Sequence, residues 1–187
     1  MRKLIVTAFV SADGVMEAPG GGEYRNAGWT FKEVPFDEAA YEIKGREQEE
    51  AGALLLGRRS YEEFAPVWPS MEEFGRYNTL PRYVVSTTLA EGDPRWPATV
   101  LRSLDEVAEL KQTDGGPILV HGSGRLGAAL ADAGLVDRYH LLVFPLLLGA
   151  GKRLFSEADK DATRLALVEH EVYANGVQKQ VLDVVTT

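Results

Sequence analysis

The sequence predicts a single α/β domain built on a mainly parallel sheet, and three observations carry this prediction. The chain has 187 residues, enough for one domain with a sizeable core and too few for two domains and a linker. Its apolar runs are short, rich in Val, Leu and Ile, and separated by helix-length stretches, which is typical of strands alternating with helices. With 45% hydrophobic and 26% charged residues, its composition is that of a folded globular protein.

Six apolar runs are predicted strands, and most of them are apolar on both faces, as strands between two helical layers are. In chain order they are Lys3 to Val10, Ala53 to Leu56, Arg82 to Ser86, Thr99 to Arg102, Pro117 to His121 and Tyr139 to Phe144. Near the C-terminus, Thr163 to Tyr173 and Val177 to Val185 flank Asn175-Gly176, a strong hairpin signal. We therefore expect the last two strands to pair antiparallel.

The helices are predicted from their end signals. The segment Asp37 to Ala51 starts with acidic residues, carries an apolar stripe and is followed by Gly52 as a stop. Its predicted stripe is Phe36, Ala40 and Ile43. Three Ser-x-x-Glu patterns predict further helix starts at Ser60/Glu63, Ser70/Glu73 and Ser103/Glu106, another helix should run from near Gly124 to Gly134, and Glu91 to Pro97 is predicted to be a surface loop.

Charge and composition argue against several classes of protein. Twenty basic and 28 acidic residues give a net charge of -8, which argues against nucleic acid as a partner. The absence of cysteine excludes disulfides, iron–sulfur clusters and thiolate zinc sites. No apolar run approaches the roughly 18 residues of a membrane span, and Leu141 to Leu148 is interrupted by Pro145. We expect a cytoplasmic protein without a membrane partner, and no metal site, since His121, His140 and His170 lack metal-ligand spacing.

Two arginines follow the second predicted strand, at the start of a short predicted helix. The segment reads Gly57-Arg58-Arg59-Ser60-Tyr61-Glu62. Because a helix N-terminus carries partial positive charge, each cation there is unfavourable by roughly 0.3 to 1 kcal/mol unless an anion binds. We expect a phosphate site here. The alternative, that both arginines are solvated or paired with Glu62, Glu63 or Glu91, stays open.

Two further strand ends carry small or glycine-rich residues. Ser86-Thr87-Thr88 follows the third strand, where the hydroxyls either meet a ligand or satisfy nearby backbone groups. Gly122-Ser123-Gly124-Arg125-Leu126-Gly127 follows the fifth strand and matches G-x-G-x-x-G. A Rossmann domain is rejected because the next strand ends in Phe144-Pro145 rather than an acid. The segment still predicts either a close approach of backbone to a phosphate or a tight strand-to-helix turn.

A fourth glycine-rich segment, Gly149-Ala150-Gly151-Lys152-Arg153, is not a phosphate-binding Walker loop, because Arg153 stands where that loop needs Ser or Thr. It could hold an anion through Lys152 and Arg153, or be a solvated basic turn.

In this order, these segments resemble the dihydrofolate reductase-like family, and within it the branch of the reductase domain of bacterial riboflavin biosynthesis. The carriers are Ser11-Ala12-Asp13-Gly14-Val15, the Gly57 to Glu62 turn, Arg82 to Ser86, and the run from His121 through Gly134-Leu135-Val136-Asp137 to Phe155. The resemblance covers nearly the whole chain. It implies a single domain over residues 1–187 with three layers, an eight-stranded mainly parallel sheet and an antiparallel C-terminal hairpin.

The resemblance implies NADPH as the cofactor and assigns the strand ends to it. Its cofactor-binding residues would be Gly14, Gly57, Arg58, Arg59, Ser60, Ser86, Thr87, Gly122, Ser123, Gly124, Arg125 and Leu126, and its substrate-binding residues Trp29, Lys152 and Arg153. Folate reductases carry an acid on the first helix, whereas this chain offers Ala40, Tyr41, Ile43 and Lys44, which argues against dihydrofolate.

The leading functional hypothesis is an NADPH-dependent reductase of a small heterocycle or carbonyl compound, similar to the reductase acting on 5-amino-6-(5-phosphoribosylamino)uracil. Asp13 is the first candidate for the proton donor and Tyr41 the second, while Asp13-Gly14 as a simple turn stays open. The alternatives are a pteridine reductase and a non-catalytic module that binds a nucleotide or dimerises. The resemblance and base rates favour a homodimer.

Overall fold

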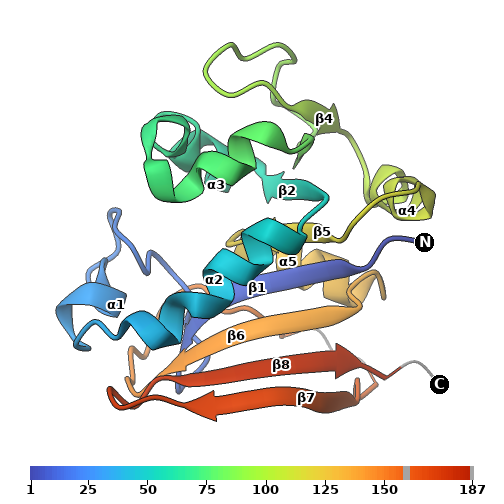
Figure 1. Ribbon diagram of the computed structural model, residues 1–187. Helices are drawn as coiled ribbons and strands as arrows, with labels where there is room; N and C mark the ends of the chain where they lie inside the picture. Colours follow the sequence, from blue (N-terminus) through green and yellow to red (C-terminus); the bar gives the residue numbers. More distant parts are fainter. Residues whose placement is uncertain (158–160, 186–187) are drawn as a thin grey trace.

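The computed structural model describes residues 1–157 and 161–185, which form helices on both faces of one eight-stranded sheet (Figure 1). The strands are β1 (Leu4–Ser11), β2 (Ala53–Gly57), β3 (Arg82–Val85), β4 (Thr99–Leu101), β5 (Ile118–His121), β6 (Arg138–Phe144), β7 (Leu165–Val172) and β8 (Gln178–Val184). Their spatial order is β4-β3-β2-β5-β1-β6-β8-β7. All pairs from β4 to β6 are parallel, and β8 pairs antiparallel with both β6 and β7, as the sequence predicts.

The register places three polar residues side by side at the centre of the sheet. Thr7 on β1 lies opposite His121 on β5 and opposite His140 on β6. Because neighbouring parallel strands share the direction of their side chains at paired positions, these three residues face the same side of the sheet.

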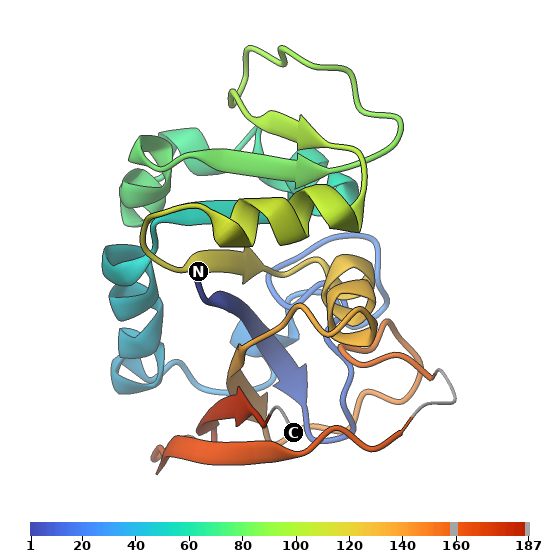
Figure 2. The same cartoon turned by 90° about the vertical axis from the view of Figure 1, so that its right-hand side faces the viewer.

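The helices divide between the two faces of the sheet. They are α1 (Trp29–Lys32), α2 (Glu38–Glu50), α3 (Arg58–Phe64), α4 (Leu104–Gln112) and α5 (Gly124–Asp132), with two 3₁₀ helices, η1 (Trp68–Ser70) and η2 (Glu72–Thr79). Figure 2 shows α2 on one side of the sheet and α5 on the other. None of the helices in residues 1–157 and 161–185 is long and apolar enough to span a membrane.

Strand β1 has two different faces that serve these two layers. Leu4, Val6, Ala8 and Val10 join the core cluster that contains the side chains of α4 and α5. The alternate residues Thr7 and Phe9 face α2 instead. The face of β1 toward α4 and α5 is therefore apolar, whereas the face toward α2 carries the polar Thr7 and the aromatic Phe9.

Helix starts follow the predicted capping pattern in one case of three. Ser103 caps α4 and accepts a hydrogen bond from Glu106 N–H (3.3 Å), as predicted. The prediction at Ser60 is wrong, because α3 already begins at Arg58 after Gly57. The prediction at Ser70 is also wrong: its hydroxyl donates to Val67 O, and the 3₁₀ helix η2 starts after Met71.

Helix α2 is capped by Asp37, whose side chain accepts from Ala39 N–H (3.2 Å). Ala40 and Ile43 are buried as predicted, but Phe36 lies before the helix and is 65% exposed, so its placement on the buried stripe is wrong. A Cβ on Gly52 would lie 2.6 Å from the backbone nitrogen of Gly116. Gly52 is therefore needed for close approach of two chain segments rather than for a left-handed helix end.

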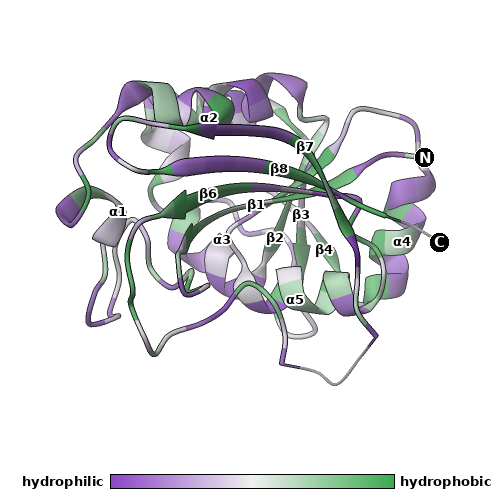
Figure 3. Cartoon of the chain, turned by 90° about the horizontal axis from the view of Figure 1, so that it is seen from below, coloured by the Kyte–Doolittle hydropathy of each residue, from purple (hydrophilic) through white to green (hydrophobic). Residues whose placement is uncertain are grey.

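The C-terminal hairpin turns at Asn175-Gly176, where Gly176 has a φ of 84°. Figure 3 shows that β6 is mostly hydrophobic, whereas β7 and β8 carry long hydrophilic stretches. The segment Glu91 to Pro97 lies outside the regular elements as predicted, yet Trp96 within it is buried and donates to Asn78 Oδ1 (2.9 Å). The expectation of a wholly surface loop is wrong at that residue.

Candidate functional site

The carboxyl ends of β2 and β5 meet in direct contact. Gly57 N–H donates to Ser123 Oγ (3.0 Å), and a Cβ on Gly57 would lie 3.5 Å from the side chain of Leu126. Helices α3 and α5 start directly after these two strands. Two helix N-termini, with their unpaired backbone N–H groups, are therefore brought to the same edge of the sheet.

The turn between β5 and α5 has an unusual backbone. Gly122 and Ser123 have φ values of 62° and 60°. This left-handed conformation suits glycine and is rare for serine, and such residues cluster at functional sites. A Cβ on Gly124 would lie 2.9 Å from Met16 Sδ, so the loop after β1 packs against this turn. Leu126 is part of the apolar core, which leaves only its backbone available to a ligand.

The two arginines occupy the first two positions of α3 and are both paired. Arg58 Nε lies 2.7 Å from Glu62 Oε1, and Arg59 Nε lies 3.1 Å from Glu63 Oε1. Both side chains are about half exposed or more. Exposed pairs of this kind contribute at most about 1 kcal/mol, so they leave both guanidinium groups available to a phosphate. The pairing that the sequence left open is present, and it is compatible with an anion site.

The hydroxyl residues after β3 connect to this helix through Arg58, which donates to Thr88 Oγ1. Ser86 is buried, and its Oγ accepts from the backbone N–H groups of Thr88 (3.2 Å) and Leu89 (2.9 Å). Ser86 therefore shapes the turn, while Thr87 is exposed beside it. The structure thus brings the predicted residues of β2, β3 and β5 to one edge.

Asp13 has its carboxylate fully engaged by groups of the chain. Ser11 Oγ donates to Oδ1 (2.6 Å), Leu148 N–H donates to Oδ1 (3.1 Å) and Gly149 N–H donates to Oδ2 (2.7 Å). The Ser11 hydroxyl, with these backbone donors, lowers the pKa of Asp13 to about 2. An ionised carboxylate has no proton to donate at neutral pH, so this geometry favours the turn over the proton donor.

Lys152 and Arg153 hold the loop that follows β1. Lys152 Nζ lies 3.0 Å from Glu17 Oε1, and this hydrogen bond lowers the pKa of Glu17. Arg153 donates to Asp13 O, and a Cβ on Gly14 would lie 3.4 Å from its Nη1. These contacts give both residues a structural role, and they place the Arg153 guanidinium against Gly14.

The chain matches the model of the RibD C-terminal domain over residues 2–179. The chain belongs to this family. It is 26% identical over 185 residues to the protein YyaP of Bacillus subtilis (strain 168), covering 94% of this chain and 92% of YyaP.

Solved structures confirm the dihydrofolate reductase-like fold of this RibD C-terminal domain. A protein of Shewanella sp. PV-4 named for riboflavin biosynthesis is similar with a TM-score of 0.76 and 20% identity, covering 98% of this chain and 99% of that one. A dihydrofolate reductase from Enterococcus faecalis gives a TM-score of 0.59 and 17% identity, covering 97% and 96%.

Trp29, one of the predicted substrate-binding residues, lies in the hydrophobic core of this RibD C-terminal domain. Trp29 is fully buried, its indole N–H donates to Glu17 O (2.8 Å), and its ring packs edge-on against Phe144 at 5.2 Å. It belongs to the core beneath the loop after β1, and this burial argues against the predicted contact with the substrate. An isolated tryptophan in a predicted loop gave no sign of which way its ring points.

Tyr41 lies among aromatic rings on α2. Its ring is 5.7 Å from that of Phe9, 6.3 Å from Phe31 and 5.1 Å from Phe36, measured between centroids. Burial raises the pKa of its phenol, against a smaller lowering by the Thr30 side chain, and the buried Oη makes no close hydrogen bond within residues 1–157 and 161–185. The phenol therefore keeps its proton and has a free donor.

Sequence reasoning missed a buried polar network next to Tyr41. Lys44 Nζ donates to Thr7 Oγ1, Thr7 Oγ1 donates to Glu47 Oε1 (2.8 Å), and His140 Nδ1 lies 2.9 Å from the same oxygen. Although burial alone would raise it, Lys44 and these hydrogen bonds hold the pKa of Glu47 well below its usual range. Because Glu47 is then ionised and only accepts, His140 donates from Nδ1.

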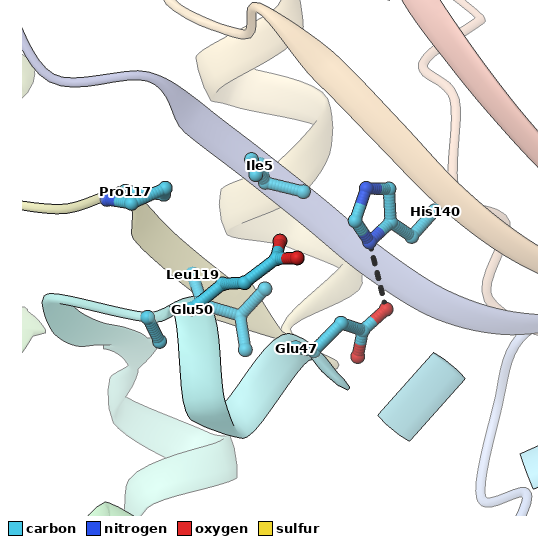
Figure 4. Close-up of a pocket in the computed structure, with 7 residues that line it drawn as sticks. Ile5, Glu47, Glu50, Pro117, Leu119 and His140 are labelled. Atoms are coloured by element: carbon cyan, nitrogen blue, oxygen red, sulfur yellow. Dashed lines mark hydrogen bonds and ion pairs between the residues drawn. The ribbon is translucent and has the colours of Figure 1, made fainter. Parts of the chain in front are cut away.

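A cavity of about 10 Å³, room for one water molecule, lies on the other side of this network (Figure 4). Its walls are Ile5, Glu47, Glu50, Ala51, Pro117, Leu119 and His140. In the described part of the chain, His140 Nε2 is buried there without a partner. The signal available in the sequence was a threonine and a histidine inside two mostly apolar strands.

Proposed function

We propose that this RibD C-terminal domain is an NADPH-dependent reductase of a small carbonyl or heterocyclic compound. Membership of the family supports a reductase role. The observation that carries the proposal is the convergence of Arg58, Arg59 and the Gly122-Ser123 turn at two adjacent helix N-termini. Backbone N–H groups and guanidinium groups together favour bound phosphates.

The residues present fit such a cofactor. Gly57 and Gly122 lack the side chains that would fill the space between α3 and the turn, and Ser123 holds a strained conformation there. Arg58 and Arg59 would hold the phosphate of the adenosine ribose, and the turn would hold the pyrophosphate. A bound nicotinamide would supply the hydride. A comparable complex exists in the fold, since the Enterococcus faecalis enzyme was solved with NADP(H).

The chain's own task would then be to bind and orient the second substrate and to supply a proton. The Tyr41 phenol is protonated and makes no close hydrogen bond within the described residues, whereas the Asp13 carboxylate is ionised and accepts three hydrogen bonds. Lys152 and Arg153 hold the neighbouring loop, which gives little support to a ribose phosphate on the substrate. A substrate without that phosphate fits this arrangement better than the phosphoribosylaminouracil.

Calorimetric titration of the wild type and Arg59→Ala with NADPH and NADH tests the cofactor. We expect the wild type to bind NADPH more tightly than NADH, and Arg59→Ala to lose roughly 1.5 to 3 kcal/mol toward NADPH alone, because it removes a charge-assisted contact to the extra phosphate. Arg76→Ala, which removes an exposed arginine on η2, is the control and should change neither affinity. Equal wild-type affinities for the two nucleotides would contradict the phosphate assignment.

A second candidate, a non-catalytic nucleotide-binding module, is favoured by one observation, the engagement of Asp13. Steady-state NADPH oxidation with a panel of pteridines, pyrimidines and simple carbonyl compounds distinguishes the two. Tight NADPH binding without oxidation of any panel member favours the module.

A further inference from the structure

The small cavity at the end of α2 lies at the opposite edge of the sheet from the candidate cofactor site. Its walls include Ile5 near the start of β1, Pro117 directly before β5 and Ala51 directly after α2. The cofactor edge, in contrast, is formed where β2, β3 and β5 end. A ligand in this cavity would therefore be separate from both the cofactor and the second substrate.

The backbone around the end of α2 keeps this space open. A Cβ on Gly52 would lie 2.6 Å from Gly116 N, so the chain after α2 passes tightly against the chain before β5. The N–H groups of Gly52 and Ala53 both donate to Pro117 O, at 2.8 and 3.2 Å. These contacts fix the last turn of α2, and Ala51 offers only a methyl group to the neighbouring space. The remaining volume of about 10 Å³ matches one water molecule.

His140 presents an unsatisfied nitrogen to this cavity. Its side chain is 4% exposed, and its Nδ1 lies 2.9 Å from Glu47 Oε1. The lowered pKa of Glu47 keeps this carboxylate ionised, so it only accepts, and His140 Nδ1 carries the proton. Lys44, 3.4 Å from Glu47, already supplies a positive charge, so a second cation on His140 is not needed. In a neutral imidazole Nε2 is then an acceptor, and no residue among 1–157 and 161–185 donates to it.

Glu50, the last residue of α2, supplies a second polar wall. Figure 4 shows its carboxylate and the ring of His140 on facing sides of the cavity. The two groups cannot satisfy each other directly, because a carboxylate and an unprotonated Nε2 are both acceptors. A water molecule has two O–H donors and can serve both at once. The other walls, apart from Glu47, are the apolar side chains of Ile5, Ala51, Pro117 and Leu119.

We propose that this cavity is a binding site for one water molecule, which donates one hydrogen bond to His140 Nε2 and the other to the Glu50 carboxylate. The water fixes His140 in the tautomer that donates to Glu47, and it attaches the last turn of α2 to β6. Glu50 and His140 are thus positioning residues for Glu47, which in turn accepts from Thr7 (2.8 Å). The bridge extends the buried network from the centre of the sheet to the exposed end of α2.

A crystal structure of the wild type at a resolution that shows ordered water tests the site directly. We expect one water within about 2.7 to 3.2 Å of both His140 Nε2 and a carboxylate oxygen of Glu50. An empty cavity, or a water that contacts only one of these two groups, would overturn the inference.

Long-range proton–nitrogen NMR spectra of the histidine rings at neutral pH report the tautomer. For His140 we expect a protonated Nδ1 and an unprotonated Nε2, because the ionised Glu47 accepts from the first and the water donates to the second. His170, which is exposed on β7, is the internal reference for a histidine in solvent. A protonated Nε2 of His140 would contradict the assignment.

Substitutions of Glu50 separate the water bridge from the charge of this residue. Glu50→Leu removes the acceptor and should lower the melting temperature by about 2 to 4 °C, because the bridging hydrogen bonds are lost. Glu50→Gln loses the charge but keeps a carbonyl that accepts from the water, so it should keep the wild-type melting temperature and the His140 tautomer. Glu49→Leu, at the neighbouring exposed position of α2, is the control and should change neither.

Two results with these variants would contradict the bridge. If Glu50→Gln were as destabilised as Glu50→Leu, the charge of Glu50 would matter rather than a bound water. If Glu50→Leu kept the wild-type melting temperature and the wild-type His140 tautomer, Glu50 would have no part in the site.

Discussion

Asp13 shows how one carboxylate can join two loops at the edge of the sheet. From the turn after β1, it accepts from Ser11, the last residue of that strand, and from Leu148 and Gly149, which lie 135 and 136 residues away. Because a carboxylate is a stronger acceptor than an amide oxygen, Asp13→Asn should destabilise the fold by about 1 to 3 kcal/mol in urea unfolding at pH 7. NADPH affinity should change little. Asp37→Asn is the matched control, since asparagine caps a helix as well as aspartate does.

The difference in stability between the wild type and Asp13→Asn should depend on pH, because the pKa of Asp13 is lowered in the folded protein. A carboxyl whose pKa falls from 3.8 to about 2 on folding stabilises the protein above pH 4, and this contribution is lost as the pH falls toward 2. The gap between wild type and Asp13→Asn should therefore narrow between pH 4 and pH 2. If Asp13 were the proton donor instead, the variant would keep its stability and lose roughly 10²- to 10⁴-fold in turnover on an identified substrate.

At the scale of the secondary-structure elements, substitution by alanine should have opposite effects on stability at Gly52 and Gly45. A Cβ on Gly52 would lie 2.6 to 2.8 Å from backbone atoms of Gly116, which cannot move without shifting β5, whereas Gly45 on α2 has open space around it. Gly52→Ala should cost about 3 kcal/mol, and Gly45→Ala should gain about 1 kcal/mol from helix propensity. In thermal unfolding this means a loss of about 6 to 12 °C against a gain of about 2 to 4 °C. A destabilised Gly45→Ala or a neutral Gly52→Ala would contradict this account.

The same elements show which features of the fold are local. The strands and the Asn175-Gly176 turn were predictable because apolar runs and turn residues act within a few positions. The Ser-x-x-Glu pattern predicted α4 correctly and failed at Ser60 and Ser70. Instead, α3 starts where β2 ends, and the start of η2 follows the packing of Trp68, Phe74 and Tyr77, whose rings stack. Such contacts between elements leave no trace in a four-residue pattern.

The candidate site also has a part that could be predicted from the sequence and a part that could not. Its cofactor edge was predictable because parallel strands end at one edge, so residues after β2, β3 and β5 must meet there. The buried network around Lys44 was not predictable, because Thr7 lies 37 positions from Lys44 and His140 lies 93 positions from Glu47. The burial of Trp29 likewise depends on Phe144, which only the folded sheet brings to it.

For the whole molecule, the open side of the sheet at β7 leads to a prediction about assembly. Leu165, Leu182 and Val184 extend the core of the α5 face, and Leu167 continues this face while 57% exposed. The register shift between Leu167 and Glu169 interrupts the edge, and such irregularities hinder strand pairing between chains. A partner is therefore expected to cover the face rather than extend the edge, which gives a closed two-fold homodimer burying roughly 1,600 Å² in total.

Sedimentation equilibrium at micromolar concentration measures this assembly directly. The wild type should be a dimer, and Leu167→Glu should weaken association by at least about tenfold, because the charge would be buried at the interface without a partner. Val67→Glu is the control: Val67 is 48% exposed, follows α3 rather than lying on β7, and should leave the dimer intact. A monomeric wild type would contradict the predicted dimer, and a dimer that withstands Leu167→Glu would place the interface elsewhere on the surface.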